Sequence, residues 1–172
     1  MKRFLSRFFS TKPDPAEALR PLWHAIVREA RDPAWYENGG IADTVEGRFD
    51  AITLVTALVM IRMERDEPLR EPSARLTELF VDDMSGQLRE SGVGDLMVGK
   101  KVGKLVGTLA GRIEAYRTGL TAADDATLEA AVDRNVSLSS AEGAHRVAER
   151  MRAMHDRFGA MDSRKLLAGE IA

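Results

Sequence analysis

Apolar residues recur at intervals of three and four along most of the chain, and this spacing constrains the fold more than any other feature. Between residues 96 and 117 the apolar positions are Val98, Val102, Leu105, Leu109, Ile113 and Tyr116. Such spacing places the side chains on one face of an α-helix, where they can be buried together. Because similar stripes follow one another along the chain, the sequence predicts an all-α fold.

Residues that start and stop helices set the expected bounds. We expect helices near residues 16–31, 46–65, 73–90, 96–117, 122–134 and 140–157. Asp32 before Pro33 ends the first of them, because the residue before proline avoids the helical region. Ser73 is the predicted N-cap of the third helix. Two capping-box patterns open the last two helices: Thr121 with Asp124, and Ser139 with Glu142.

The longest apolar run, at residues 51–61, is rich in β-branched residues and has the composition of a strand. Its length and the lack of a partner strand favour a helix instead. At 11 residues it is well short of the roughly 20 that span a bilayer, so we expect a buried core helix. The prediction is a single compact helical domain of about six helices over residues 13–172, preceded by a basic, Phe-rich segment at residues 1–12.

Composition narrows the classes of function. The formal net charge of −2 gives no general attraction to nucleic acid, and we expect no specific nucleic-acid recognition. The chain has no cysteine, and His24, His145 and His155 are too scattered for a local metal pair. The sequence therefore predicts no catalytic residues, no metal site and no cofactor.

Residues 94–101, GDLMVGKK, fit the phosphate-binding pattern G-x-x-x-x-G-K-[ST] except at the last position, where Lys101 stands. A P-loop needs a buried strand leading into its glycines, whereas an amphipathic helix precedes these. We expect a junction between two helices, with Gly92 and Gly94 at the bend and Asp95 as N-cap of the second helix. No nucleotide site is predicted.

Glycines recur every four residues within that second helix, at Gly99, Gly103, Gly107 and Gly111. Each costs about 1 kcal/mol relative to alanine in a helix interior. One interpretation is a groove in which another helix or an apolar client segment approaches closely. The alternatives are a tight contact with one of the chain's own helices, or an exposed face that tolerates glycine.

Several motifs closely resemble those of the ubiquinol–cytochrome c chaperone family, the assembly factors of the cytochrome bc complex. They are DTVEGRFD at residues 43–50, FVDDM at 80–84, LRESGVGDLMVGKKV at 88–102, GRIEAY at 111–116 and DRNV at 133–136. The chain departs from the family at Gly103 and Gly107, where relatives have polar or charged residues, and at Leu109 and Ala110, where they have an aromatic pair. These departures weaken the interpretation of a glycine groove.

The resemblance implies an all-α, non-enzymatic assembly chaperone that holds newly made cytochrome b. Its mitochondrial members work with a small partner subunit near the ribosome, whereas this chain has the compact bacterial form. We therefore expect a cytoplasmic protein, with peripheral contact at the inner membrane as an open alternative. A different client, a ribosome contact and a partner subunit also stay open.

The predicted working surface lies where the third and fourth helices meet. The expected client contacts are Phe80, Val81, Asp82, Asp83, Met84, Met97, Val98, Lys100 and Lys101. The residues expected to hold the junction are Arg48, Phe49, Gly92, Gly94, Asp95, Gly99, Gly111 and Arg112. Core packing is the alternative role for Phe80, Met84 and Val98, and an ion pair with Arg48 is the alternative for Asp82 and Asp83.

The N-terminal segment carries basic and apolar residues with no acidic residue. Lys2, Arg3, Phe4, Arg7 and Phe8 are the expected contacts with a membrane surface or a ribosome. An adaptor that uses this segment is the alternative function.

Overall fold

The apolar run at residues 51–61 lies in a helix that other helices surround. The computed structural model describes residues 17–90 and 95–171, with the backbone alone described at residue 88 and at 95–102. Its α-helices are α1 (Arg20–Ala30), α2 (Val45–Met63), α3 (Arg70–Glu90), α4 (Asp95–Thr121), α5 (Ala126–Asn135), α6 (Gly143–Gly159) and α7 (Ser163–Leu167). Short 3₁₀ turns lie at η1 (Glu17–Leu19), η2 (Pro33–Trp35) and η3 (Glu67–Leu69). The prediction of an all-α fold is confirmed.

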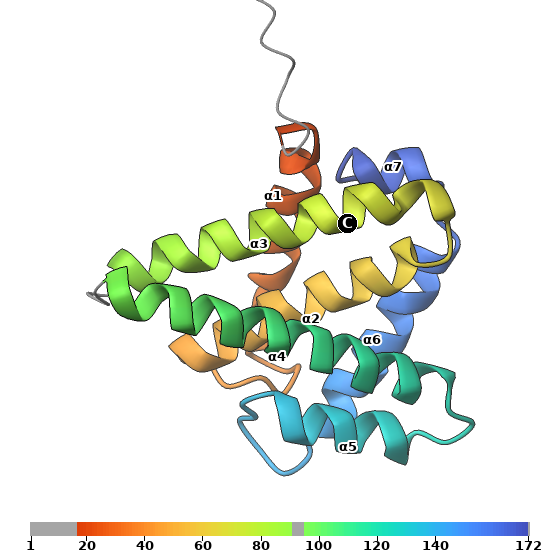
Figure 1. Ribbon diagram of the computed structural model, residues 1–172. Helices are drawn as coiled ribbons and strands as arrows, with labels where there is room; N and C mark the ends of the chain where they lie inside the picture. Colours follow the sequence, from red (N-terminus) through yellow and green to blue (C-terminus); the bar gives the residue numbers. More distant parts are fainter. Residues whose placement is uncertain (1–16, 91–94, 172) are drawn as a thin grey trace, which may run out of the picture.

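Helix α2 lies at the centre and packs against α1, α3, α4 and α6 (Figure 1). Every residue from Asp50 to Met63 is buried. A helix enclosed in this way needs apolar residues on all its faces, which is why its sequence resembles a buried strand. The hydroxyls of Thr53 and Thr56 are satisfied within the helix, because they donate to the carbonyls of Phe49 (2.9 Å) and Ile52 (2.7 Å).

Helices α3 and α4 lie side by side in front of α2, and residues 91–94 connect them (Figure 1). Helix therefore precedes and follows the glycines of the near-miss phosphate motif, as predicted from the sequence. The core stripe of α3 includes Phe80, whose ring meets Trp23 of α1 edge to face, with centroids 6.2 Å apart.

Three predicted caps are wrong. Helix α3 begins at Arg70, three residues before Ser73, since the 3₁₀ turn η3 leads directly into it. Thr121 is the last residue of α4 and therefore does not cap the next helix. Of the predicted pair, Asp124 accepts a hydrogen bond from the Thr127 backbone N–H at 2.8 Å. Helix α6 begins at Gly143 with no side-chain cap, and the Ser139 N–H donates instead to the Gly40 carbonyl.

That bond is part of a pairing between two loops that are distant in sequence. Ala42 donates to the carbonyl of Ser137 (2.8 Å), and Ser139 donates to that of Gly40 (2.9 Å). Gly40 has a φ of +94°, and a Cβ there would lie 2.5 Å from the Gly143 Cα, so only glycine fits. The pairing fixes the loop after α5 against the start of α2.

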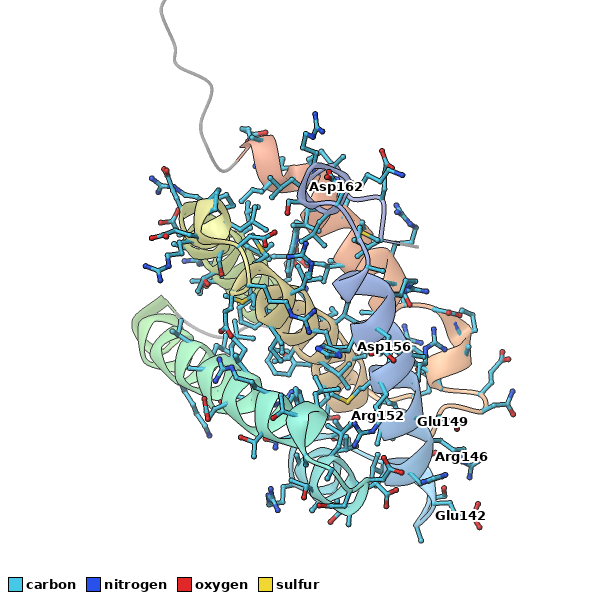
Figure 2. The ribbon with its side chains drawn as sticks, turned by 90° about the vertical axis from the view of Figure 1, so that its right-hand side faces the viewer. Glu142, Arg146, Glu149, Arg152, Asp156 and Asp162 are labelled. Atoms are coloured by element: carbon cyan, nitrogen blue, oxygen red, sulfur yellow. The ribbon has the colours of Figure 1, made fainter. Side chains whose placement is uncertain are left out.

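Helix α6 covers the side of α2 opposite to α4, and it has one buried and one charged face. Its buried stripe is Val147, Ala148, Met151, Met154 and Phe158. Figure 2 shows the charged side chains along this helix, among them Arg146, Glu149 and Arg152, with Glu142 just before its first residue. Within the described part of the chain, no helix has the combined length and hydropathy needed to cross a membrane.

Candidate functional site

The motif at residues 43–50 shapes the start of α2. The Thr44 hydroxyl accepts from the Gly47 backbone N–H at 3.1 Å and caps the helix. Gly47 lies against the Ala42 carbonyl, leaving no room for a Cβ. Arg48 donates from Nε to Asp43 at 2.7 Å. Asp43, Thr44 and Arg48 thus each have a local structural task at the start of α2.

The last residue of that motif, Asp50, is the centre of a buried polar tie. Its Oδ1 accepts from Arg112 Nη2 at 2.6 Å, and its Oδ2 accepts from the Ser137 backbone N–H (2.9 Å) and hydroxyl (2.8 Å). The side chains of Asp50 and Arg112 are each 9% exposed. This tie joins α2 and α4, which carry two of the sequence motifs, to Ser137, which directly follows the DRNV motif at the end of α5.

The tie leaves polar atoms without partners. Nε and Nη1 of Arg112 are buried and make no hydrogen bond. The hydroxyl of Tyr116, one turn further along α4, is also buried without a partner, and burial raises the pKa of this phenol well above its ordinary value. The Arg112 guanidinium lies 6.0 Å from the centre of the Phe49 ring.

An open groove of about 920 Å³ lies over this tie, and we call it the motif groove. Its apolar lining includes Val45, Phe49, Ile52 and Leu105. Its arginines are Arg31, Arg48, Arg112 and Arg134. Glu46 and Asp50 are its acidic residues, and Asp50 is already bound to Arg112 and Ser137. The groove thus combines an apolar lining with an excess of positive charge.

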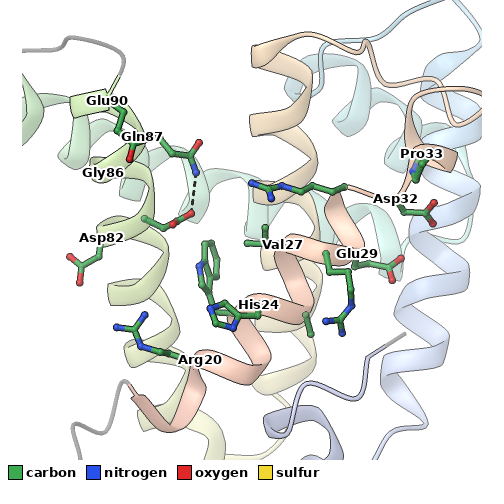
Figure 3. A pocket seen from close by; sticks show the side chains of 15 residues that line it. Arg20, His24, Val27, Glu29, Asp32, Pro33, Asp82, Gly86, Gln87 and Glu90 are labelled. Carbon is green, nitrogen blue, oxygen red and sulfur yellow. Dashed lines mark hydrogen bonds between the residues drawn. The ribbon is translucent and has the colours of Figure 1, made fainter.

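A second groove of about 1030 Å³ runs between α1 and α3, and we call it the α1–α3 groove. In Figure 3 Asp82, Gln87 and Glu90 come from α3, and Arg20, His24 and Val27 come from α1. The α3 wall carries acidic residues, whereas the α1 wall carries arginines together with Glu29 and Asp32. Arg31 and Gln87 belong to both grooves, so the two form one continuous surface.

The predicted client contacts on α3 have different environments. Phe80 and Met84 are 0% and 2% exposed, so their role is the alternative one of core packing rather than direct contact. Val81 is half-buried, while Asp82 and Asp83 are exposed and line the α1–α3 groove. Asp83 accepts from Gln87 at 3.0 Å.

The alternative pairing of these two aspartates with Arg48 is wrong. Arg48 is bound by Asp43, five residues before it in the sequence, and its guanidinium lies 5.9 Å from the Tyr36 ring centre. The capping motif at the start of α2 holds Asp43 close enough to bind Arg48 locally.

Other predicted residues lie outside what the structure describes. Gly92, Gly94 and the N-terminal residues Lys2, Arg3, Phe4, Arg7 and Phe8 are outside the described residues. Asp95, Met97, Val98, Gly99, Lys100 and Lys101 lie in the first turns of α4, where only the backbone is described. Their proposed contacts stay predictions.

The described glycines of α4 lie on an open face. A Cβ at Gly103, Gly107 or Gly111 would meet nothing within 4 Å. The interpretation of a tight contact with one of the chain's own helices is therefore wrong for these three positions, and no close approach requires the predicted junction residue Gly111. Gly119 differs, because a Cβ there would lie 2.7 Å from the Leu128 Cα of α5.

Sequence reasoning missed Asp50, Ser137 and Tyr116 as parts of the site. One signal was available for Arg112: it lies seven residues after Leu105 and four before Tyr116, so it shares their apolar stripe. A charge on a buried stripe needs a partner of opposite charge. No local spacing identifies that partner as Asp50, 62 residues away.

An all-α domain with open, apolar-lined and charged-rimmed grooves between its helices has the architecture of proteins that bind other polypeptides. The described residues contain no cluster of His, Asp and Glu arranged to hold a metal ion. The chain belongs to the ubiquinol-cytochrome C chaperone family, whose sequence model matches residues 37–172.

A solved structure supports this assignment. The chain is similar to the crystal structure of the Cbp3 homolog from Brucella abortus, with 28% sequence identity and a TM-score of 0.78. The match covers 91% of this chain and 88% of that one. A comparison with curated proteins finds no significant match.

Proposed function

We propose that the protein binds newly made cytochrome b and holds it during assembly of the ubiquinol–cytochrome c reductase complex, without catalysing a reaction. Membership of the chaperone family supports a protein client. The observation that carries the proposal is the convergence of three motifs, from α2, α4 and the end of α5, on one groove.

The physical task is to cover apolar helices of the client reversibly. Burial contributes roughly 25 cal/mol per Å² of apolar surface, so a few hundred Å² suffice for useful binding after ordering costs are subtracted. Val45 is 81% exposed at the edge of the motif groove, beside the half-buried Phe49 and Leu105. These side chains provide apolar surface to the client while the chaperone stays folded.

The α1–α3 groove extends this surface, and Asp82 and Asp83 are proposed to form its charged rim. Val81 and Met97 are proposed as apolar contacts beside it, at the meeting of α3 and α4. A small partner subunit or the ribosome is proposed to bind outside the motif groove.

Site-specific photocrosslinking during cytochrome b synthesis tests the proposal. A photoreactive residue at Val45 should crosslink to the nascent client, and residues at Val81 and Met97 test the second part of the surface. Glu149, exposed on the charged face of α6 (Figure 2), is the matched control and should stay uncrosslinked. A strain without the protein that still assembles the complex normally would disprove the function itself.

A further inference from the structure

We propose that the motif groove recognises a carboxylate on an apolar client segment, and that Arg112 is the residue that binds it. This inference rests on the proposed function, since it assumes that a polypeptide occupies the groove. It adds the chemistry by which the occupant is recognised.

The first observation is the incomplete bonding of Arg112. The residue is 8% exposed and lines the motif groove, yet only its Nη2 has a partner. Buried polar groups are nearly always hydrogen-bonded, so two orphaned nitrogens on one guanidinium need an explanation. A carboxylate accepts hydrogen bonds from an arginine in a strong, charge-assisted geometry.

The second observation is the charge of the groove. Asp50 balances the charge of Arg112 but bonds only one of its three guanidinium nitrogens. Asp43 pairs with Arg48. Arg31 and Arg134 form no ion pair with the described residues and both are exposed, and they outnumber Glu46, the acidic lining residue that likewise has no ion pair with the described residues. The excess of positive charge favours an acidic group over a basic one, while Val45, Phe49 and Leu105 favour apolar neighbours for it.

The open form of the groove favours a polypeptide over a lipid. The lining comes from α2, α3, α4, the end of α5 and the loop after it, so an occupant lies across several elements at the surface rather than inside a closed cavity. An elongated helix with one acidic residue among apolar ones matches that arrangement.

Two labelled helical peptides of leucine and alanine provide the probe, identical except that one has a central glutamate and the other a glutamine. Fluorescence anisotropy with the full chain should show about tenfold tighter binding of the glutamate peptide, as expected when a charged acceptor replaces a neutral one. Equal affinities would show that the glutamate carboxylate does not bind Arg112, and the proposal would be overturned.

Variants locate the effect. Arg112→Lys should remove most of the preference for glutamate, and Val45→Asp should weaken glutamate-peptide binding by repulsion at the exposed groove edge. Val45→Asp keeps the buried tie intact, so it remains informative if Arg112→Lys does not fold. Arg146→Gln, on α6, is the control and should bind like the wild type.

A direct readout is the Nε–H signal of Arg112 in a nitrogen-15 NMR spectrum. The signal should shift on addition of the glutamate peptide and stay in place with the glutamine peptide. If Arg112 had only a structural role, the signal would not distinguish the two peptides. Displacement of both peptides by laurate, with laurate itself moving the Arg112 signal, would assign the groove to lipid and overturn the proposal. A client crosslink at Val45 without any glutamate preference would overturn this inference and leave the proposed function standing.

Discussion

At the scale of single residues, the buried tie between Asp50 and Arg112 distinguishes this protein from a simple apolar bundle. Burying two charges is expensive unless they are paired and hydrogen-bonded. Here Asp50 binds both Arg112 and Ser137, so its carboxylate is well satisfied, whereas the guanidinium is not. The tie therefore holds three segments together and leaves two guanidinium nitrogens of Arg112 without partners.

This asymmetry makes Asp50 a sensitive position. Asp50→Ala leaves a buried arginine without its counter-charge, and we expect a loss of about 3–5 kcal/mol in the free energy of unfolding. Urea denaturation measures the loss. The matched control is Asp43→Ala, whose pair with Arg48 is more than half exposed on both sides and should contribute much less than the buried pair. Similar losses in the two variants would contradict the structural role given to the buried tie.

At the scale of elements, α4 has two kinds of glycine. Gly103, Gly107 and Gly111 lie on the open face, where glycine makes the unfolded chain more flexible and gives no packing advantage. Gly119 lies where α4 meets α5, and its missing side chain lets the two backbones approach. One helix thus contains glycines that folding does not require and one that it does.

Alanine substitutions separate these roles. Each of Gly103→Ala, Gly107→Ala and Gly111→Ala should raise the free energy of unfolding by about 0.5–1 kcal/mol, because the helix gains propensity without a clash. Gly119→Ala should lower it by about 1–3 kcal/mol, because the new Cβ meets the α5 backbone. Thermal and urea unfolding of the four variants provide the comparison. Destabilisation at the three open positions would show that something in the fold does cover that face.

Helix α2 shows how an element depends on its neighbours. Its apolar residues lie on all its faces because α1, α3, α4 and α6 surround it. Taken alone, its sequence suits a strand nearly as well as a helix.

At the scale of the whole molecule, the pH dependence of stability combines two histidines with opposite effects. Burial and then the charge of Arg65 lower the pKa of His155, whose Nε2 lies 2.7 Å from Arg65 Nη2. The hydrogen bond to Glu129 raises the pKa of His145, which lies 2.8 Å from that carboxylate.

The signs follow from which state binds the proton more tightly. His155 binds a proton more readily in the unfolded chain than in the folded one. Its contribution to folding stability is therefore lost as the pH falls below 6.5, the ordinary pKa of histidine. His145 makes its full contribution to folding stability below pH 6.5. This contribution is lost as the pH rises through the raised pKa of His145 in the folded protein. Near pH 6 the two effects oppose each other.

Single variants reveal each effect. From about pH 7.5 to about pH 5.5, His155→Gln should make the Tm fall less on acidification than in the wild type. His145→Gln should make the Tm fall more, by a smaller amount because the pair of His145 with Glu129 is more exposed. Calorimetry or circular dichroism at several pH values measures the Tm. His24→Gln, an exposed position, is the control, and unchanged slopes in the two test variants would contradict this account.

The sequence by itself determined the helical class, the approximate helix bounds and the family, because these depend on periodicity and short motifs that a linear reading preserves. It also determined that no strand leads into the glycines at residues 92–99, since the apolar stripe before them has helical spacing. Residue spacing within one helix is a local property, and local properties survive without a structure.

Only the tertiary structure decided where the surfaces lie. It buried Phe80 and Met84, assigned Asp43 rather than Asp82 or Asp83 to Arg48, and joined Asp50 to Arg112 and Ser137 across 62 and 87 residues. The physical reason is that charge pairing and groove formation depend on which helix faces meet. Those meetings follow from packing around α2, and no short stretch of sequence specifies them.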